Sequence, residues 1–137
     1  MALWLLTACD RQPDQEAASI SLPADASCDV APGCSVAIND FSVDFLIGPE
    51  PRALRSFAVR ARIPDDASIT AIAVEFVMVD MQMGMNRYRL VPQSNRTWRA
   101  DVTLPVCVSG RSDWIAQFEL LSHEGRTRVD IPFSLER

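Results

Sequence analysis

The sequence predicts an all-β fold, an immunoglobulin-like antiparallel β-sandwich of about seven strands. Short stretches of apolar residues recur between residues 36 and 135, turn-forming residues separate them, and little helical periodicity is present. Apolar residues make up 48% of the chain. Removal of an N-terminal leader and tether leaves about 110 residues, which is enough for one sandwich core.

Residues 1–8 are expected to be the remnant of a lipoprotein signal peptide. Residues 2–8 are mostly apolar, and Leu6-Thr7-Ala8-Cys9 resembles the lipobox of bacterial lipoproteins, in which lipid is attached to the cysteine sulfur. We therefore predict lipidation at Cys9 and a lipid anchor in a membrane. Asp10 resembles the signal that retains some lipoproteins in the inner membrane, so the predicted location is its periplasmic face in the bacterial cell envelope. A buried N-terminal strand or helix is the alternative.

Residues 9–27 are predicted to be a flexible tether, because most of this stretch is polar and has no clear period. The β-sandwich domain is expected over residues 28–137. No segment has the ~18 uninterrupted apolar residues that indicate a membrane-spanning helix. The net charge of −5 argues against nucleic acid as a partner, since phosphate binding needs a concentrated basic surface.

The strands are expected in the following order. Residues 36–47 give one or two short strands that end at the Gly48-Pro49-Glu50-Pro51 break, and residues 54–63 alternate up to a Pro-Asp-Asp turn. Residues 69–80 form the most apolar stretch and are rich in β-branched residues, which favours a central strand covered on both sides. The remaining strands are expected over residues 87–91, 97–104, 114–121 and 127–135.

The four cysteines allow more than one pairing. With Cys9 lipidated, an odd number remains for an oxidising compartment. In the chain-entropy model a Cys28–Cys34 bridge contributes about 2.4 kcal/mol and a Cys34–Cys107 bridge about 4.4 kcal/mol. Entropy alone favours the long bridge, but a local pair forms readily and Cys28 and Cys34 enclose a Pro-Gly turn, so we favour their pairing. Cys107 is then an unpaired thiol, either buried and inert or available as a ligand or redox group.

Four methionines lie within the eight residues 78–85. Thioether sulfur is a soft donor that favours Cu(I), although methionine also fills irregular cores and contact surfaces. If the strand that starts at Ile69 continued through this run, alternation would place Met81, Met83 and Met85 on one face and Met78 in the core. The pattern therefore predicts a Cu(I) site made by Met81, Met83 and Met85.

Cys107 is the candidate for a fourth donor, because Pro105 breaks the preceding strand and can turn the thiol toward the same end of the sandwich. His123, the only histidine, lies in a predicted turn, where a solvated surface position is the usual case. No nucleophile motif frames the Ser, His and acidic residues, so we do not expect an enzyme.

Two segments resemble a known group of proteins. Met-Gly-Met-Asn-Arg-Tyr at residues 83–88 and Pro-Val-Cys-Val-Ser-Gly at residues 105–110 look like small periplasmic proteins of proteobacteria that are similar to YtkA-like and FixH-like immunoglobulin-type domains. Those proteins are associated with Sco-type copper chaperones and cytochrome oxidase assembly. The resemblance implies a copper-related role and a partner of that kind, although this chain lacks the His-Met pairing of many periplasmic copper carriers.

Taken together, these features predict a membrane-tethered periplasmic protein that binds Cu(I) or docks a copper-delivering partner, in cytochrome oxidase assembly. The competing hypothesis is a metal-free interaction module of the envelope, whose methionines form an adaptable contact patch for another protein.

Overall fold

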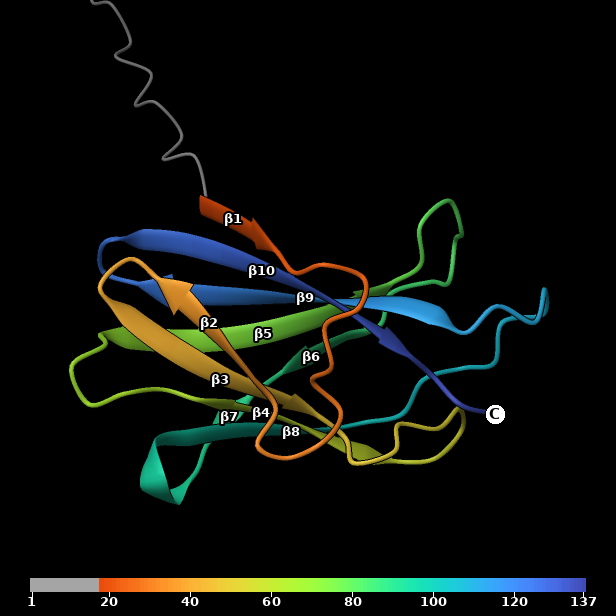
Figure 1. Cartoon of the computed structure of the whole chain (residues 1–137), viewed down its shortest axis with the longest axis horizontal. Coiled ribbons are helices and arrows are strands. Elements are labelled where there is room, and N and C mark those ends of the chain that lie inside the picture. The colour runs from red at the N-terminus through yellow and green to blue at the C-terminus, as the bar shows by residue number, and fades with distance from the viewer. Residues whose placement is uncertain (1–17) are drawn as a thin grey trace, which may run out of the picture.

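The computed structural model describes residues 18–137, which form two five-stranded sheets packed face to face (Figure 1). The first sheet has the strand order β1-β10-β9-β5-β6 and the second β2-β3-β4-β8-β7. In the first sheet the strands are β1 (Ala18–Ser21), β5 (Ile69–Val77), β6 (Arg87–Arg89), β9 (Asp113–Ser122) and β10 (Gly125–Ser134). In the second they are β2 (Cys34–Ile38), β3 (Phe41–Ile47), β4 (Phe57–Arg62), β7 (Val91–Pro92) and β8 (Thr97–Val102), with a short 3₁₀ turn (Ser94–Arg96) before β8. The predicted all-β sandwich is therefore confirmed, with ten strands in place of about seven.

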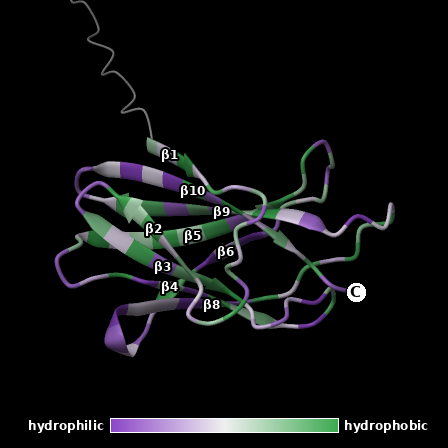
Figure 2. Cartoon of the chain, viewed as in Figure 1, coloured by the Kyte–Doolittle hydropathy of each residue, from purple (hydrophilic) through white to green (hydrophobic). Residues whose placement is uncertain are grey.

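Alternation along the strands builds the core between the two sheets. Apolar stretches run along the strands and hydrophilic residues occupy most of the turns (Figure 2). Phe45 of β3 and Phe118 of β9 meet across the sheets with ring centroids 4.6 Å apart, and Trp114 of β9 is also fully buried. Each aromatic ring of this size removes a large apolar area from water, so these side chains contribute strongly to the stability of a small core.

Strand β5 differs from the prediction in two ways. One face is buried through Ile72, Val74 and Phe76, but the alternate residues on its other face are half-buried, so the expected coverage on both sides is wrong. This difference arises because no further layer of the described chain lies over the outer face of that sheet. The strand also ends at Val77, before the methionine run, so that run does not continue it.

Strand β1 lies within residues 9–27, the range predicted to be a tether. It pairs in parallel with β10, with Ala18 opposite Thr127, so the sandwich includes residues well before position 28. The predicted lipidation site Cys9 and the predicted signal-peptide remnant lie outside the described residues. Over residues 18–137, no helix is long and apolar enough to cross a membrane.

A disulfide links Cys28 to Cys34, the first residue of β2, with Cα atoms 4.9 Å apart. It is the local pairing that the sequence favours. Gly33 has a φ of +89°, and a Cβ at this position would clash with the backbone carbonyl oxygen of Phe45. The turn therefore depends on glycine for both its backbone conformation and its close approach to β3.

Three loops gather at one end of the sandwich, which we call the loop end (the right-hand side of Figure 1). They are residues 48–56 after β3, 78–86 after β5 and 103–112 after β8. The first and third are joined by a hydrogen bond that the Leu54 N–H donates to the Leu104 carbonyl at 2.9 Å. The chain enters β1 toward the opposite end, because Ala18 lies beside the start of β10.

Candidate functional site

The methionine run forms the loop between β5 and β6, which we call the methionine loop (residues 78–86). Met78 and Met81 face each other in an isolated antiparallel bridge, and the chain turns between them at Asp80, which has a φ of +60°. The Asn86 side-chain amide donates to the Met83 carbonyl at 2.9 Å, and the Phe76 N–H donates to the Asn86 carbonyl at 2.9 Å. These bonds give the loop a defined shape without a strand ladder.

The four methionines occupy three kinds of environment. Met78 is 4% exposed and belongs to the core, as predicted, while Met85 is 86% exposed. Met81 and Met83 are partly buried and pack against the edge of the core. The side chains predicted to share one face of a strand therefore come from a curved loop, and they range from half-buried to fully accessible.

Cys107 lies in the loop between β8 and β9 and is 3% exposed. Its sulfur is 3.0 Å from the Ser109 hydroxyl, and its carbonyl accepts a hydrogen bond from the Gly110 N–H at 3.0 Å. Hydrogen bonds from the Ser109 hydroxyl and backbone, with further help from Arg111, lower the pKa of the Cys107 thiol from its ordinary value, although burial opposes this effect. The thiolate is the form that binds metals, so these surroundings favour the ligand form of the sulfur.

Arg111 joins the cysteine loop to the methionine loop. Its guanidinium donates to the Val79 carbonyl at 3.0 Å and forms two hydrogen bonds with the Asp113 carboxylate, at 2.6 and 3.0 Å. The bidentate pair lowers the pKa of Asp113 and raises that of Arg111. Two segments about 30 residues apart in sequence are thereby held side by side at the loop end.

The predicted donors lie in two neighbouring loops, but Met85 lines a hollow on the outer face of the first sheet with Arg87 and Glu119. Met81, Met83 and Met85 share one short loop, and Cys107 lies in the loop bonded to it. His123 is exposed in the β9–β10 turn, at the other end of the sandwich. Within the described part of the chain, no three His, Cys, Asp or Glu side chains are grouped closely enough to hold a metal ion. A metal site here would therefore depend on thioether sulfur.

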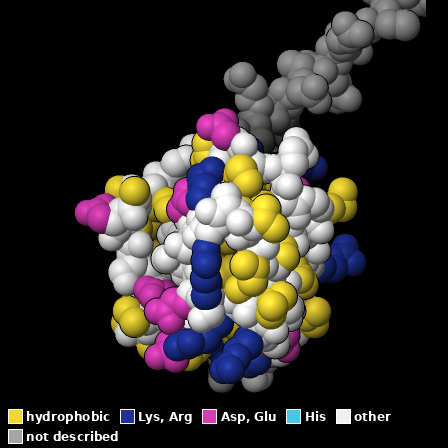
Figure 3. All heavy atoms as spheres, turned by 90° about the vertical axis from the view of Figure 1, so that its right-hand side faces the viewer, with side chains coloured by type: hydrophobic (Ala, Val, Ile, Leu, Met, Phe, Trp, Pro, Cys, Tyr) yellow, Lys and Arg dark blue, Asp and Glu magenta, His cyan; other side chains and the backbone are white. Residues whose placement is uncertain are grey.

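Sequence reasoning missed an exposed apolar surface at the loop end. Large apolar side chains stand exposed on all three loops, and Val108 is fully exposed. Viewed from this end, apolar side chains gather on the surface with arginines among them (Figure 3). The members are Leu54, Val79, Val106 and Val108. Met85 is exposed as well, but it lines a separate hollow on the outer face of the first sheet. The available signal was the pair Val106 and Val108, which lie between the predicted strands 97–104 and 114–121, because segments that connect strands normally favour polar residues.

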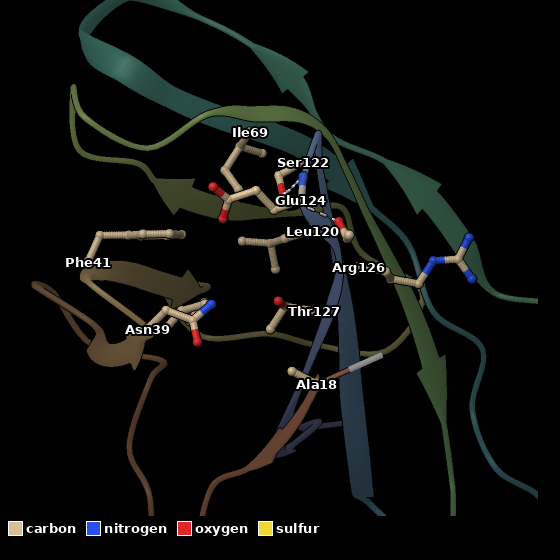
Figure 4. A pocket seen from close by; sticks show the side chains of 11 residues that line it. Ala18, Asn39, Phe41, Ile69, Leu120, Ser122, Glu124, Arg126 and Thr127 are labelled. Atoms are coloured by element: carbon tan, nitrogen blue, oxygen red, sulfur yellow. Dashed lines mark hydrogen bonds between the residues drawn. The ribbon is translucent and has the colours of Figure 1, made fainter. Parts of the chain in front are cut away.

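A small hollow at the opposite end of the sandwich has fewer reactive or charged side chains than the loop end. It has a volume of about 150 Å³ and lies between the β2–β3 turn and the start of β10 (Figure 4). Glu124 is the only acidic residue among the described residues that line it, and the Glu124 N–H donates to the Ser122 hydroxyl at 3.2 Å. Arg126 points away from the hollow (Figure 4). We therefore place the candidate site at the loop end.

Comparison of the chain with protein-family models, curated proteins and solved structures gives no match. The function is therefore inferred from the structure of the loop end.

Proposed function

We propose that this chain is a membrane-tethered envelope protein that binds Cu(I) through its methionine loop. The observation that carries the proposal is the hydrogen bond from Arg111 to the Val79 carbonyl, which holds the methionine loop beside the loop that contains Cys107. Neutral thioethers and a thiolate are soft donors and suit Cu(I) better than harder ions. The proposed partner is a copper chaperone or an assembly factor of cytochrome oxidase.

The solvent exposure of the sulfur-bearing residues suggests the order in which they would bind the Cu(I) ion. Met85 is open to solvent and would meet the ion first, while Met81 and Met83 sit at the edge of the core in the same loop. At Gly84, with a φ of +74°, nothing lies within 4 Å of an added Cβ, so the loop has free space in which to close. Cys107 would join only after its loop shifts, because the residue is buried.

An anaerobic Cu(I) titration of the full chain tests this proposal. We expect a variant in which Met81, Met83 and Met85 are all leucine to lose at least ~10-fold in affinity, or about 1.4 kcal/mol. Met78→Leu is the matched control, because it changes a buried thioether of the same run and is a volume-conserving swap. Equal affinities for the wild type and the triple variant would eliminate the site.

The pH dependence of binding separates the two kinds of donor. Thioethers do not titrate near neutrality, so binding through the methionines alone should hardly change between neutral and mildly acidic solution. A Cys107 thiolate would make binding weaker in acid, because the proton competes with the metal. We expect Cys107→Ala to abolish any such dependence while leaving the methionine contribution intact.

A second candidate function is a metal-free interaction module, which the exposed apolar surface of the loop end favours. Contiguous apolar patches of more than a few hundred Å² on a monomer commonly mark interaction sites. Under this proposal, Leu54→Asp with Val108→Asp would abolish association with a purified candidate partner, and chelators would have no effect. Loss of association on chelation would favour the copper proposal instead.

A further inference from the structure

A groove of about 520 Å³ lies beside the loop end, between residues 24–29 and the ends of β9 and β10. Its lining is mostly apolar, with Val79 of the methionine loop, Ile115, Pro132 and Phe133 among its members. This volume falls within the range of about 300–1,000 Å³ that is usual for ligand pockets. Since Val79 also belongs to the exposed apolar surface, the groove continues that surface.

Among the described residues that line the groove, the charged side chains are all acidic. They are Asp25, Asp29 and Asp113. The charge of Asp113 is already balanced by Arg111. Within residues 18–137, the Asp29 carboxylate accepts a single hydrogen bond, from the Ser27 hydroxyl at 2.9 Å. Asp25 has no hydrogen-bond or ion-pair partner among residues 18–137. An occupant that brings its own positive charge therefore gains attraction here, whereas an acidic one is repelled.

We propose that this groove receives an apolar segment of another envelope protein that carries an arginine or lysine side chain. Its aliphatic groups would contact Val79, Pro132 and Phe133, and its cation would lie beside Asp25 and Asp29. The inference rests on the proposed function only for the location of the partner. It does not depend on bound metal, because none of the described residues that line the groove is a methionine.

Fluorescence anisotropy with the metal-free full chain tests the inference. The probe is a labelled peptide of alternating leucine and serine with one central arginine, and its comparison is the same peptide with uncharged citrulline. We expect the arginine peptide to bind about three- to fivefold more tightly, a preference typical of exposed ion pairs, and the preference to vanish at high salt. Asp25→Asn with Asp29→Asn should remove the preference while leaving weak apolar binding.

Three further variants make the result specific to the groove. Ala24→Trp should block both peptides, because Ala24 is exposed and lines the groove, so a bulky side chain is tolerated there. Val108→Ser, outside the groove, should bind like the wild type. The variant with Met81, Met83 and Met85 all changed to leucine should also bind the arginine peptide like the wild type. The groove proposal can therefore hold even if the copper proposal fails.

Two results would overturn the inference. The first is equal binding of the arginine and citrulline peptides to the wild type. The second is peptide binding that appears only after the apolar residues 2–8 are made polar, since that would assign the groove to the chain's own N-terminal segment.

Discussion

The Cys107 sulfur has two properties that normally oppose each other. The residue is buried, which favours the neutral thiol, yet hydrogen bonds from Ser109 and the backbone favour the thiolate. A thiolate that is stabilised by hydrogen bonds but shielded from solvent would resist oxidation. It would remain available to an ion bound by the neighbouring methionine loop. Sequence inspection identified Cys107 as unpaired but could not decide between these properties, because both depend on how the Val-Ser-Gly turn folds around the sulfur.

We expect Ser109→Ala to raise the pKa of Cys107. The variant removes the hydroxyl that does most to lower this pKa from its ordinary value of 9.0. Thiolate absorbance across a pH titration measures the shift, in a Cys9→Ser background so that only Cys107 titrates. A pKa unchanged by the substitution would mean that the Ser109 hydroxyl does not stabilise the thiolate.

The same pKa has a consequence for stability. Because the folded-state pKa lies below the unfolded one, the thiolate stabilises the fold above the unfolded pKa, and this contribution is lost as pH falls through the folded pKa. The difference in unfolding free energy between the wild type and Cys107→Ala should therefore grow as pH rises from neutrality past 9.0. Urea unfolding at several pH values measures this difference, and a constant difference would contradict the assignment.

At the scale of elements, strand β5 shows both what the sequence can predict and what it cannot. The strand itself was predictable, because apolar and β-branched residues run from Ile69 onward. Its end was not, since the period of two continues through Met81, Met83 and Met85 in the sequence. A strand also needs a partner. Ile115 of β9 pairs with Val77, and because the two strands are antiparallel and β9 begins at Asp113, β9 has only two residues left beyond this pair. The chain beyond Val77 therefore turns, at a Val-Asp pair that gives no strong turn signal.

The contact between the two sulfur-bearing loops should depend on Arg111. We expect Arg111→Gln to speed amide hydrogen exchange over residues 79–86, because the bond to the Val79 carbonyl is lost. The cost in global unfolding free energy should be about 1 kcal/mol or less, since the Arg111–Asp113 pair is partly exposed. Arg126→Gln is the control, because that exposed arginine pairs with Glu119 away from the loop end. Unchanged exchange in the methionine loop would show that the two loops are held together by other contacts.

At the scale of the whole molecule, the main feature is how the sandwich arranges its two ends. The fold class and the local disulfide were predictable from alternation and cysteine spacing. The apolar loop end was not, because Leu54, Val79 and Val108 are distant in sequence and only the sandwich topology gathers them. A lipid-anchored chain would present this end away from the bilayer, because β1 starts near the other end.

Removing the disulfide should weaken the whole domain without dismantling it. For Cys28→Ser with Cys34→Ser we expect a loss of about 2 kcal/mol in unfolding free energy, the value of a short closed loop in the chain-entropy model. Urea unfolding measures the loss, and Cys107→Ser is the comparison that removes a cysteine without removing a cross-link. A loss near zero would indicate that Gly33 and its neighbours keep the turn in place unaided.

The parallel pairing of β1 with β10 also decides how the domain would respond to mechanical tension. If an anchor pulls on the N-terminal side of Ala18 while a partner is bound at the loop end, the force acts along the length of the sandwich. The four register pairs that join β1 to β10, from Ala18–Thr127 to Ser21–Asp130, would then be sheared together rather than peeled apart one at a time. A short strand can in this way act as a strong mechanical clamp.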